Sequence, residues 1–306
     1  MIVSASRRTD IPAFYAAWMM ERLRAGSVLV RNPFNARQVS RVSLSRQDAE
    51  LIVFWTKDAS NMLSHLDELD GMGHKYMFQY TLTPYGPDVE PGVDKRRAAD
   101  AFEKLSARIG PRRMIWRYDP ILLSGSWTQE KHIKAFEATC RRLEGAGQRC
   151  VISFVDLYAS VRRTAGWIQA PTERQMHEMA REIAGIARRY GFLPSACAEA
   201  ADFSADGLER RGCIDRLDVE AALGVPVREE KDAGQRTACR CIRSVDIGAY
   251  DTCPHGCVYC YARTGKRSIA EADVHSPILG APLTGEEKIT DRKEKPLAIG
   301  QISLFG

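Results

Sequence analysis

Six short apolar segments, each followed by a stretch with helical periodicity, constrain the fold of this chain more than any other feature. They are rich in β-branched and aromatic residues and span residues 2–5, 51–55, 76–80, 114–116, 150–155 and 192–196. The helical stretches, many of which end at a glycine, span residues 11–25, 59–69, 94–109, 130–144, 173–190 and 215–223. Nearly continuous apolar strands that alternate with helices indicate a parallel sheet with the helices outside it. The sequence therefore predicts an α/β fold, either a partial (β/α)6 barrel of the TIM-barrel type or an open doubly wound sheet.

The rest of the chain predicts how it is divided. Residues 28–45 interrupt the alternation after the first helix and are expected to form an extended insertion. We assign residues 1–228 to the barrel and residues 229–268 to a cysteine-rich segment. Residues 269–306, in which Lys, Glu, Asp, Pro and Gly are frequent, are expected to form an extended tail.

The composition is that of a globular protein, with 44% hydrophobic and 27% charged residues. The net charge of +5 suits an anionic substrate without requiring one. No apolar run is long enough to span a membrane, and charges at Arg7, Arg8 and Asp10 interrupt any signal-peptide core. We therefore expect a cytoplasmic protein, in which nine cysteines point to metal or redox chemistry rather than to a disulfide framework.

Polar side chains follow the predicted strands at their carboxyl ends, where the catalytic and ligand-binding residues of parallel α/β folds lie. From them we select the candidate catalytic residues Arg8, Asp10, Lys57, Arg117 and Asp119. A guanidinium group suits a carboxylate or phosphate, and an aspartate can accept hydrogen bonds from ribose hydroxyls. The alternative is that these arginines and aspartates pair with one another or cap the next helix.

Three cysteines near the C-terminus carry the clearest chemical signal. Cys253, Cys257 and Cys260 stand at C-x3-C-x2-C in a loop that also contains Pro254 and Gly256. Three thiolates at this spacing can hold three irons of a [4Fe–4S] cluster and leave the fourth iron open. Gly256 suits a tight turn and has no side chain to obstruct a bulky cofactor. The alternative is a structural zinc site, which needs four ligands and often uses paired C-x2-C elements.

The spacing of this triplet, with Tyr259 directly before the last cysteine, resembles the cluster loop of the radical S-adenosylmethionine (SAM) superfamily. The string His255-Gly-Cys257-Val-Tyr-Cys260-Tyr-Ala is especially similar to the spore photoproduct lyase branch of that superfamily. The whole chain, from Ser6-Arg-Arg-Thr-Asp10 onward, also resembles a bacterial family of unknown function with a radical-SAM-like cysteine cluster at its C-terminal end.

The resemblance implies a partial barrel, a [4Fe–4S] cluster whose open iron binds SAM, and an electron donor such as flavodoxin or ferredoxin. It places Tyr259 and Gly256 beside the cofactors. Two features depart from the superfamily pattern, because the cysteine loop follows the sixth unit instead of the first strand and no Gly-Gly-Glu-Pro string is present. Either residues 244–250 form a strand that leads into the loop of a permuted barrel, or the cysteine segment packs over the barrel mouth.

A second group of cysteines lies between the last predicted strand and the triplet: Cys197, Cys213, Cys239 and Cys241. Four thiolates suit a second [4Fe–4S] cluster or an all-thiolate zinc site, and auxiliary clusters are what the resemblance implies. The alternative is that Cys197 and Cys213 are small buried hydrophobic residues. Cys140 and Cys150 are expected in the core, because one lies in a predicted helix and the other opens a predicted strand.

The chain ends in Gln301-Ile-Ser-Leu-Phe305, an apolar pair after a polar linker. The segment resembles the pentapeptide that binds the bacterial sliding clamp, which implies a docking role for it. The alternative is a final strand or an apolar plug folded back onto the barrel.

Two functions from different classes remain open. The first is an enzyme that reductively cleaves SAM at the Cys253, Cys257 and Cys260 cluster and abstracts hydrogen from a substrate in the barrel mouth. The resemblance of the loop to spore photoproduct lyase and that of the tail to clamp-binding peptides both favour nucleic acid or a nucleotide as the substrate. The second is a non-catalytic iron–sulfur or zinc protein for electron transfer, sensing or stability. A polar mouth favours the enzyme, because a structural metal does not need one.

Overall fold

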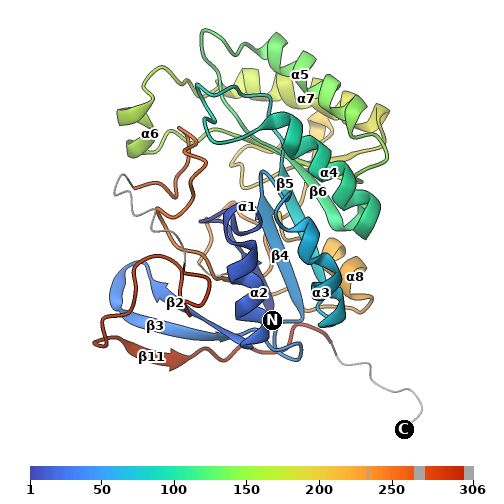
Figure 1. Ribbon diagram of the computed structural model, residues 1–306. Coiled ribbons are helices and arrows are strands. Elements are labelled where there is room, and N and C mark those ends of the chain that lie inside the picture. The colour runs from blue at the N-terminus through green and yellow to red at the C-terminus, as the bar shows by residue number, and fades with distance from the viewer. Residues whose placement is uncertain (233, 265–272, 300–306) are drawn as a thin grey trace, which may run out of the picture.

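The computed structural model describes residues 1–232, 234–264 and 273–299, and its centre is a parallel sheet (Figure 1). The sheet has eight strands in the order β10-β1-β4-β5-β6-β7-β8-β9, and every neighbouring pair is parallel. Six of the strands are those predicted: β1 (Ile2–Ala5), β4 (Leu51–Thr56), β5 (Tyr76–Thr81), β6 (Met114–Ile121), β7 (Arg149–Phe154) and β8 (Leu193–Ala196). Two short strands, β9 (Glu209–Arg210) and β10 (Val245–Asp246), flank them. The predicted parallel α/β fold is therefore confirmed.

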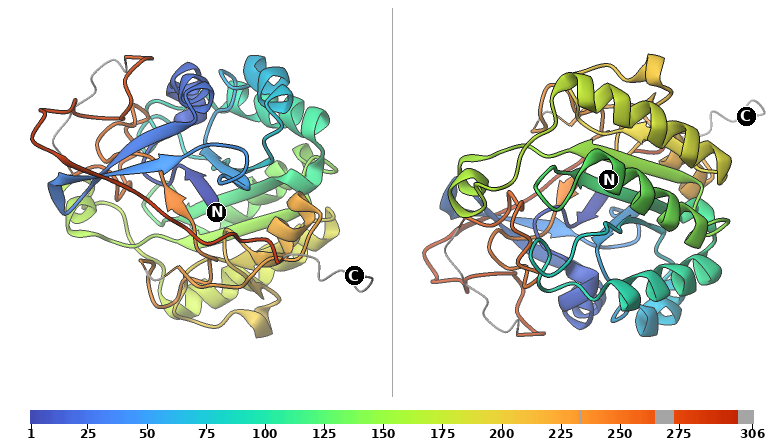
Figure 2. Two further views of the ribbon diagram at one scale, coloured as in Figure 1. Left: turned by 90° about the horizontal axis from the view of Figure 1, so that it is seen from below. Right: turned by 90° about the horizontal axis from the view of Figure 1, so that it is seen from above.

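One face of the sheet is covered by the helices that follow the strands (Figure 2). These are α1 (Ile11–Phe14), α2 (Ala16–Arg24), α3 (Leu66–Gly71), α4 (Lys95–Ile109), α5 (Gln129–Arg142) and α7 (Glu173–Arg189). Alternate strand residues such as Phe54, Phe78 and Trp116 are buried against the apolar stripes of α2, α3, α4, α5 and α7. Cys140 and Cys150 belong to the same core, as predicted. The six strands from β1 to β8 follow chain order without a reversal, which differs from the order of a doubly wound sheet.

Two helix predictions are wrong in detail, and one helix was missed. The stretch 11–25 is broken at Tyr15, where φ is −131° and the backbone leaves the helical region between α1 and α2. The stretch 59–69 begins as turns and a 3-10 helix (Leu63–His65) and becomes α-helical only at Leu66. A short helix, α6 (Ala159–Thr164), was not predicted.

The opposite face of the sheet, which we call the inner face, is covered by the cysteine-rich part of the chain and not by the outer helices. Ile2, Val53 and Met77 point to this side, where a second core contains Cys213 and Cys241. Helix α8 (Arg216–Leu223) contributes Val219 to the same core. The expectation that residues 215–223 form another outer helix is therefore wrong, because the apolar side of this helix packs on the inner face of the sheet.

The predicted insertion is a β-hairpin of β2 (Ser27–Asn32) and β3 (Asn35–Ser43), which is extended as expected. From the C-terminal segment, β11 (Lys288–Asp291) adds to β3 in parallel (Figure 1). The same segment returns to the sheet, where Glu50 accepts hydrogen bonds from the backbone N–H groups of Leu297 and Ala298 at 2.8 and 2.9 Å. Gln301–Phe305, the proposed docking segment, lies outside the described residues. No helix in the described part of the chain is long and apolar enough to cross a membrane.

Candidate functional site

A cavity of about 530 Å³ opens at the carboxyl ends of the strands. Its lining includes the five predicted catalytic residues Arg8, Asp10, Lys57, Arg117 and Asp119. It also includes the seven predicted metal-binding cysteines, Cys197, Cys213, Cys239, Cys241, Cys253, Cys257 and Cys260, together with Tyr259. Gly256 is not among the lining residues; its φ of +70° instead places it in the left-handed region that a glycine adopts without strain. The fold therefore brings together residues, such as Arg8 and Cys260, that are far apart in the chain.

The triplet enters this cavity because β10 lies at the sheet edge beside β1. Asp246, the last residue of β10, accepts hydrogen bonds from the hydroxyls of Ser4 and Ser6 at 2.9 and 2.8 Å and from the Arg7 backbone N–H at 2.8 Å. One half-buried carboxylate thus joins the strand before the cysteine loop to the loop after β1. Of the expected strand over residues 244–250, only residues 245–246 form a strand, which pairs with β1 before the chain enters the cysteine loop.

Backbone contacts hold the other side of the cysteine loop. The Gly92 N–H donates to the His255 carbonyl at 2.9 Å, and the Val258 N–H donates to the Val89 carbonyl at 3.0 Å. The two backbone segments approach so closely that a Cβ added at Gly92 would lie 2.8 Å from the backbone Cα and O of His255. Gly92 is therefore required here for close packing rather than for an unusual φ.

We predict that Gly92→Ala displaces the cysteine loop, because backbone atoms cannot rotate away from the added methyl group. The free energy of unfolding should fall by about 2 kcal/mol, the usual cost of overpacking. The iron retained per chain after anaerobic reconstitution should fall as well. Gly125→Ala is the matched control, since no atom lies within 4 Å of a Cβ at that position. Equal stability and iron content in the two variants would contradict the close approach.

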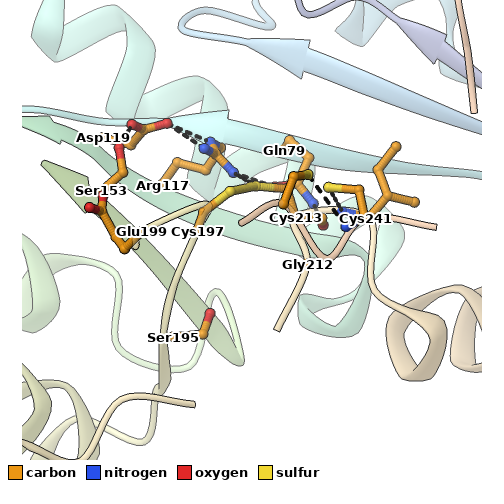
Figure 3. The surroundings of a disulfide bond; sticks show 12 residues. Gln79, Arg117, Asp119, Ser153, Ser195, Cys197, Glu199, Gly212, Cys213 and Cys241 are labelled. Carbon is orange, nitrogen blue, oxygen red and sulfur yellow. Dashed lines mark hydrogen bonds and ion pairs between the residues drawn. A yellow bond between two sulfur atoms is a disulfide. The ribbon is translucent and has the colours of Figure 1, made fainter. Parts of the chain in front are cut away.

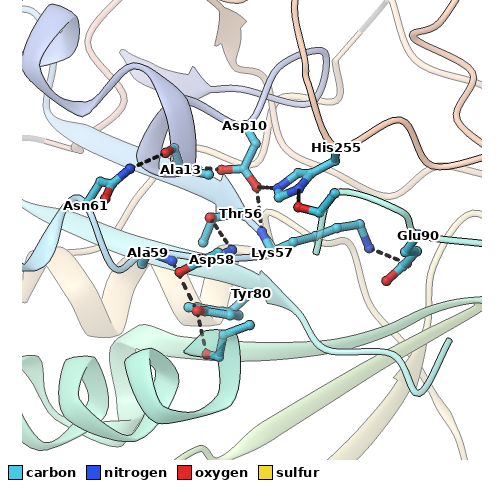
Figure 4. A network of polar contacts seen from close by, with 12 residues as sticks. Asp10, Ala13, Thr56, Lys57, Asp58, Ala59, Asn61, Tyr80, Glu90 and His255 are labelled. Atoms are coloured by element: carbon cyan, nitrogen blue, oxygen red, sulfur yellow. Dashed lines mark hydrogen bonds and ion pairs between the residues drawn. The ribbon is translucent and has the colours of Figure 1, made fainter. Parts of the chain in front are cut away.

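Asp10 and His255 form the polar contact that fixes the loop from within the cavity (Figure 4). Asp10 Oδ1 accepts the Ala13 N–H at 3.0 Å and so caps α1, while Oδ2 accepts the Lys57 backbone N–H at 2.7 Å. The same Oδ2 lies 2.8 Å from His255 Nε2, and His255 Nδ1 lies 2.9 Å from the Gly92 carbonyl. Both ring nitrogens of His255 therefore face oxygen atoms of the protein. Asp10 is thus fully engaged with protein partners and acts as a positioning residue.

A second buried network surrounds Glu90, which lies in the loop after β5. Lys57 Nζ donates to Glu90 Oε1 at 2.8 Å, and Lys95 and the Tyr259 hydroxyl donate to the same carboxylate. Burial opposes the charged form of Glu90, but the two ammonium groups outweigh it and lower the pKa of this carboxyl to about 2. Burial likewise opposes the charge on Lys57, and Glu90 outweighs it and raises the pKa of the ammonium. Tyr259, which directly precedes Cys260, is held by this charged carboxylate.

Of the triplet cysteines, Cys257 is buried beside this network, and Cys253 and Cys260 are half-buried. Burial raises the pKa of Cys253 to about 12, and it raises the pKa of Cys257 and Cys260 as well. The Lys57 charge opposes that rise at Cys257 and Cys260, so a cation already lies where thiolates would need one. In the described part of the chain, no three His, Cys, Asp or Glu side chains are grouped as they would be around a single metal ion. A cubane cluster spreads its sulfur ligands farther apart, by about 6–7 Å.

The other four cysteines lie on the inner face of the sheet (Figure 3). Cys197 and Cys213 are joined as a disulfide, a pairing that the sequence did not predict. Cys239 and Cys241 are free thiols in the same core, so the four are brought together as expected. A hydrogen bond from the Cys239 thiol, aided by the Arg7 charge, outweighs burial and lowers the pKa of Cys241.

Two arginines lie over one tryptophan ring at the cavity, and one of them, Arg117, contacts Cys213. The guanidinium groups of Arg7 and Arg117 lie 4.9 and 5.1 Å from the ring centroid of Trp55. Arg117 also pairs with Asp119, whose pKa is lowered because the Arg117 charge and a Ser153 hydrogen bond outweigh burial. Arg117 and Asp119 therefore pair with each other. This is the alternative to a catalytic role that the sequence left open for them.

Arg8 differs from these residues because its charge is directed to the open cavity. Its guanidinium lies 5.2 Å from the Tyr250 ring, and it forms no ion pair with another described residue. The rings of Tyr158 and Tyr261, 39% and 45% exposed, lie 6.2 Å apart at the same cavity. Arg8 and these tyrosines therefore form an aromatic and basic mouth.

Sequence reasoning missed four residues that build this site: Glu90, Asp246, Trp55 and His255. His255 stands inside the recognised cysteine loop, so its position could have suggested a role in holding the loop. Glu90 lies in an irregular segment with no periodicity, and Asp246 follows a strand of only two residues. For Glu90 and Asp246, no motif or periodicity in the sequence indicated a place in the site.

The chain was compared with protein families and with solved structures. The family model described as "Domain of unknown function (DUF1848)" matches residues 2–262. The chain belongs to this family. The expectation of a family of unknown function that covers nearly the whole chain is thereby confirmed.

A search of curated proteins gave no match. Among solved structures, the chain is similar to a protein of Bacteroides thetaiotaomicron VPI-5482 named as an alpha-L-fucosidase, at 13% sequence identity and a TM-score of 0.32. That match covers 72% of this chain and 82% of the other. At this TM-score the likeness supports no conclusion about the present chain.

Proposed function

We propose that this protein is a radical SAM-type enzyme that holds a [4Fe–4S] cluster through Cys253, Cys257 and Cys260. One observation carries the proposal: the three thiols line the same cavity as the polar residues at the strand ends. A structural metal would have no need of a 530 Å³ polar cavity beside it. An enzyme needs such a space for its substrate.

The residues present fit this cofactor. Their loop offers three thiols and no fourth, which leaves one iron of a cubane without a protein ligand. Lys57 supplies positive charge next to Cys257 and Cys260. When bound, such a cluster supplies the electron that cleaves SAM into methionine and a 5′-deoxyadenosyl radical.

The sheet order supports the same proposal. In the superfamily that the loop resembles, the cysteine loop follows the first strand of a partial barrel. Here β10 precedes the loop and takes the first position in space, followed by β1, β4, β5, β6 and β7 in chain order. We interpret the sheet as a permuted partial barrel, in which the strand that carries the cysteines has moved to the end of the chain.

The protein's own residues have separable roles in this proposal. Asp10 and His255 hold the cysteine loop against β1 and Gly92. Glu90, with Lys57 and Lys95, fixes Tyr259 next to the triplet. Arg8 remains available to bind an anionic group of the substrate.

For the substrate we propose a nucleotide, free or extruded from a nucleic acid. The exposed rings of Tyr158 and Tyr261 can stack on a base, and Arg8 can pair with a phosphate. Filter binding of a single-stranded oligonucleotide should weaken about tenfold or more when Arg8→Ala is combined with Tyr261→Ala. Unchanged binding would exclude this mouth as the contact.

Two partners belong to the proposal. A flavodoxin or ferredoxin would supply the electron, and Gln301–Phe305 would bind a sliding clamp. Calorimetric titration of the clamp, with Leu304→Ala and Phe305→Ala together as the comparison, tests the second partner. Equal binding by the two proteins would exclude it.

The enzyme is tested by anaerobic incubation of the reconstituted protein with SAM and dithionite. We expect 5′-deoxyadenosine by mass spectrometry from the wild type and from Cys140→Ala, which changes a core cysteine far from the triplet in sequence. Replacing Cys253, Cys257 and Cys260 by alanine should remove the product. A protein that carries iron and sulfide but forms no 5′-deoxyadenosine would favour the non-catalytic alternative.

A further inference from the structure

Four cysteines from three separate segments converge on the inner face of the sheet, apart from the triplet loop (Figure 3). Cys197 follows β8 and Cys213 precedes α8, while Cys239 and Cys241 belong to the irregular segment before β10. All four are at least nine-tenths buried. Cysteines that were only small core residues would not need to meet at one place, and two other cysteines, Cys140 and Cys150, lie in the other core.

The backbone is shaped to bring these segments together. A Cβ added at Gly212 would lie 2.6 Å from the Arg240 carbonyl oxygen, so the segments that carry Cys213 and Cys241 are in direct backbone contact. The Ile214 N–H donates to Cys241 Sγ at 3.4 Å, and the Cys241 N–H donates to Cys239 Sγ at 3.5 Å. Backbone donors aimed at sulfur are the contacts that stabilise thiolate ligands.

Positive charge is buried next to these sulfurs. Arg117 Nη1 donates to Cys213 Sγ at 2.8 Å. Arg7 bonds the hydroxyls of Ser4 and Ser244, and its Nη2 is buried without a hydrogen-bond partner among the residues described. A buried guanidinium with an unused donor is costly unless an anionic partner is present.

We propose that Cys197, Cys213, Cys239 and Cys241 together bind a metal centre as four thiolates. Four thiolates around Zn²⁺ or around a [4Fe–4S]²⁺ core give a centre with two negative charges. Arg7, and Arg117 with its contact to Cys213 Sγ, place positive charge in the same buried region, although Arg117 also pairs with Asp119. The two metals share this ligand chemistry, and metal analysis distinguishes them.

The disulfide between Cys197 and Cys213 is the alternative state of the same site. Converting it to two thiols takes two electrons and two protons, which a dithiol supplies as it is oxidised to its own disulfide. The two protons then leave as the thiols become metal ligands. The site thus exists either as a disulfide with two free thiols or as four thiolates around metal.

The test uses the full chain with Cys253, Cys257 and Cys260 changed to alanine, purified anaerobically with dithiothreitol. Elemental and sulfide analysis should find either about one zinc per chain or about four irons with four sulfides. Adding Cys239→Ser and Cys241→Ser should remove that metal, while adding Cys140→Ala should leave it. A folded triplet-free protein without metal, or metal that survives the Cys239 and Cys241 changes, overturns the proposal.

A second arm covers the case in which the triplet-free chain does not fold. In the otherwise wild-type chain, Cys239→Ser with Cys241→Ser should remove either the zinc or about half of the iron. Unchanged metal content there overturns the inference. Neither result decides whether the triplet cleaves SAM, so the failure of this inference and the failure of the proposed enzyme remain distinguishable.

Discussion

Glu90→Gln is expected to lower the free energy of unfolding by about 3 kcal/mol, because it leaves the half-buried ammonium groups of Lys57 and Lys95 without their counter-charge. Glu90 is itself fully buried and holds Lys57 and Lys95. A neutral amide keeps the size of the side chain but cannot offset these charges. The Tyr259 hydroxyl also loses a charged acceptor, so the cysteine loop should bind less iron. Urea denaturation followed by tryptophan fluorescence, under anaerobic conditions, measures the first effect.

The matched control is Glu130→Gln. Glu130 pairs with Lys134 one helical turn away, and both side chains are 76% exposed. Such a pair contributes about 0.5 kcal/mol or less. If both variants lose equally little stability, the Glu90 network does not support the fold in the way proposed.

Asp10→Ala is expected to lower the free energy of unfolding by about 3 kcal/mol. The loss of the α1 cap costs about 1 kcal/mol, and the buried Lys57 N–H and the His255 ring lose their acceptor at a further cost of about 2 kcal/mol. Because His255 belongs to the cysteine loop, the iron retained per chain should fall in the same variant. Denaturation and iron analysis of one preparation measure both effects.

Asp94→Ala separates the cap from the loop contact. Asp94 caps α4 by accepting the Arg96 and Arg97 N–H groups, and among the described residues its side chain forms no hydrogen bond or ion pair with the cysteine loop. Its loss should cost about 1 kcal/mol and leave the iron content unchanged. Iron loss of the same size in both variants would show that Asp10 does not position the loop.

Much of the fold could be predicted because its signal is local. Each of the six central strands is an apolar run of the right length, and helices such as α4 and α7 have clear caps and apolar stripes. The position of α8 could not be predicted in this way. Its sequence is compatible with a helix on either face, and only the packing of Val219 against the inner core decides which.

The candidate site could be predicted where a rule about the ends of strands or about the spacing of cysteines applies. The carboxyl ends of parallel strands meet at one edge, so Asp10, Lys57 and Asp119 share a cavity as expected. Their partners were not predictable, because Glu90 and Asp246 reach the site from irregular or very short segments. The contact between the Cys213 and Cys241 segments likewise depends on a close approach at Gly212 that no local pattern reports.

The central claim is that the triplet holds a cluster with an open iron that binds SAM. The most direct measurement is the electron paramagnetic resonance spectrum of the dithionite-reduced, anaerobically reconstituted protein, recorded with and without SAM. We expect a [4Fe–4S]⁺ signal that changes when SAM is added, with the SAM-sensitive part missing when Cys253, Cys257 and Cys260 are alanine. A spectrum that SAM leaves unchanged, or a triplet that binds zinc and no iron, would contradict the account.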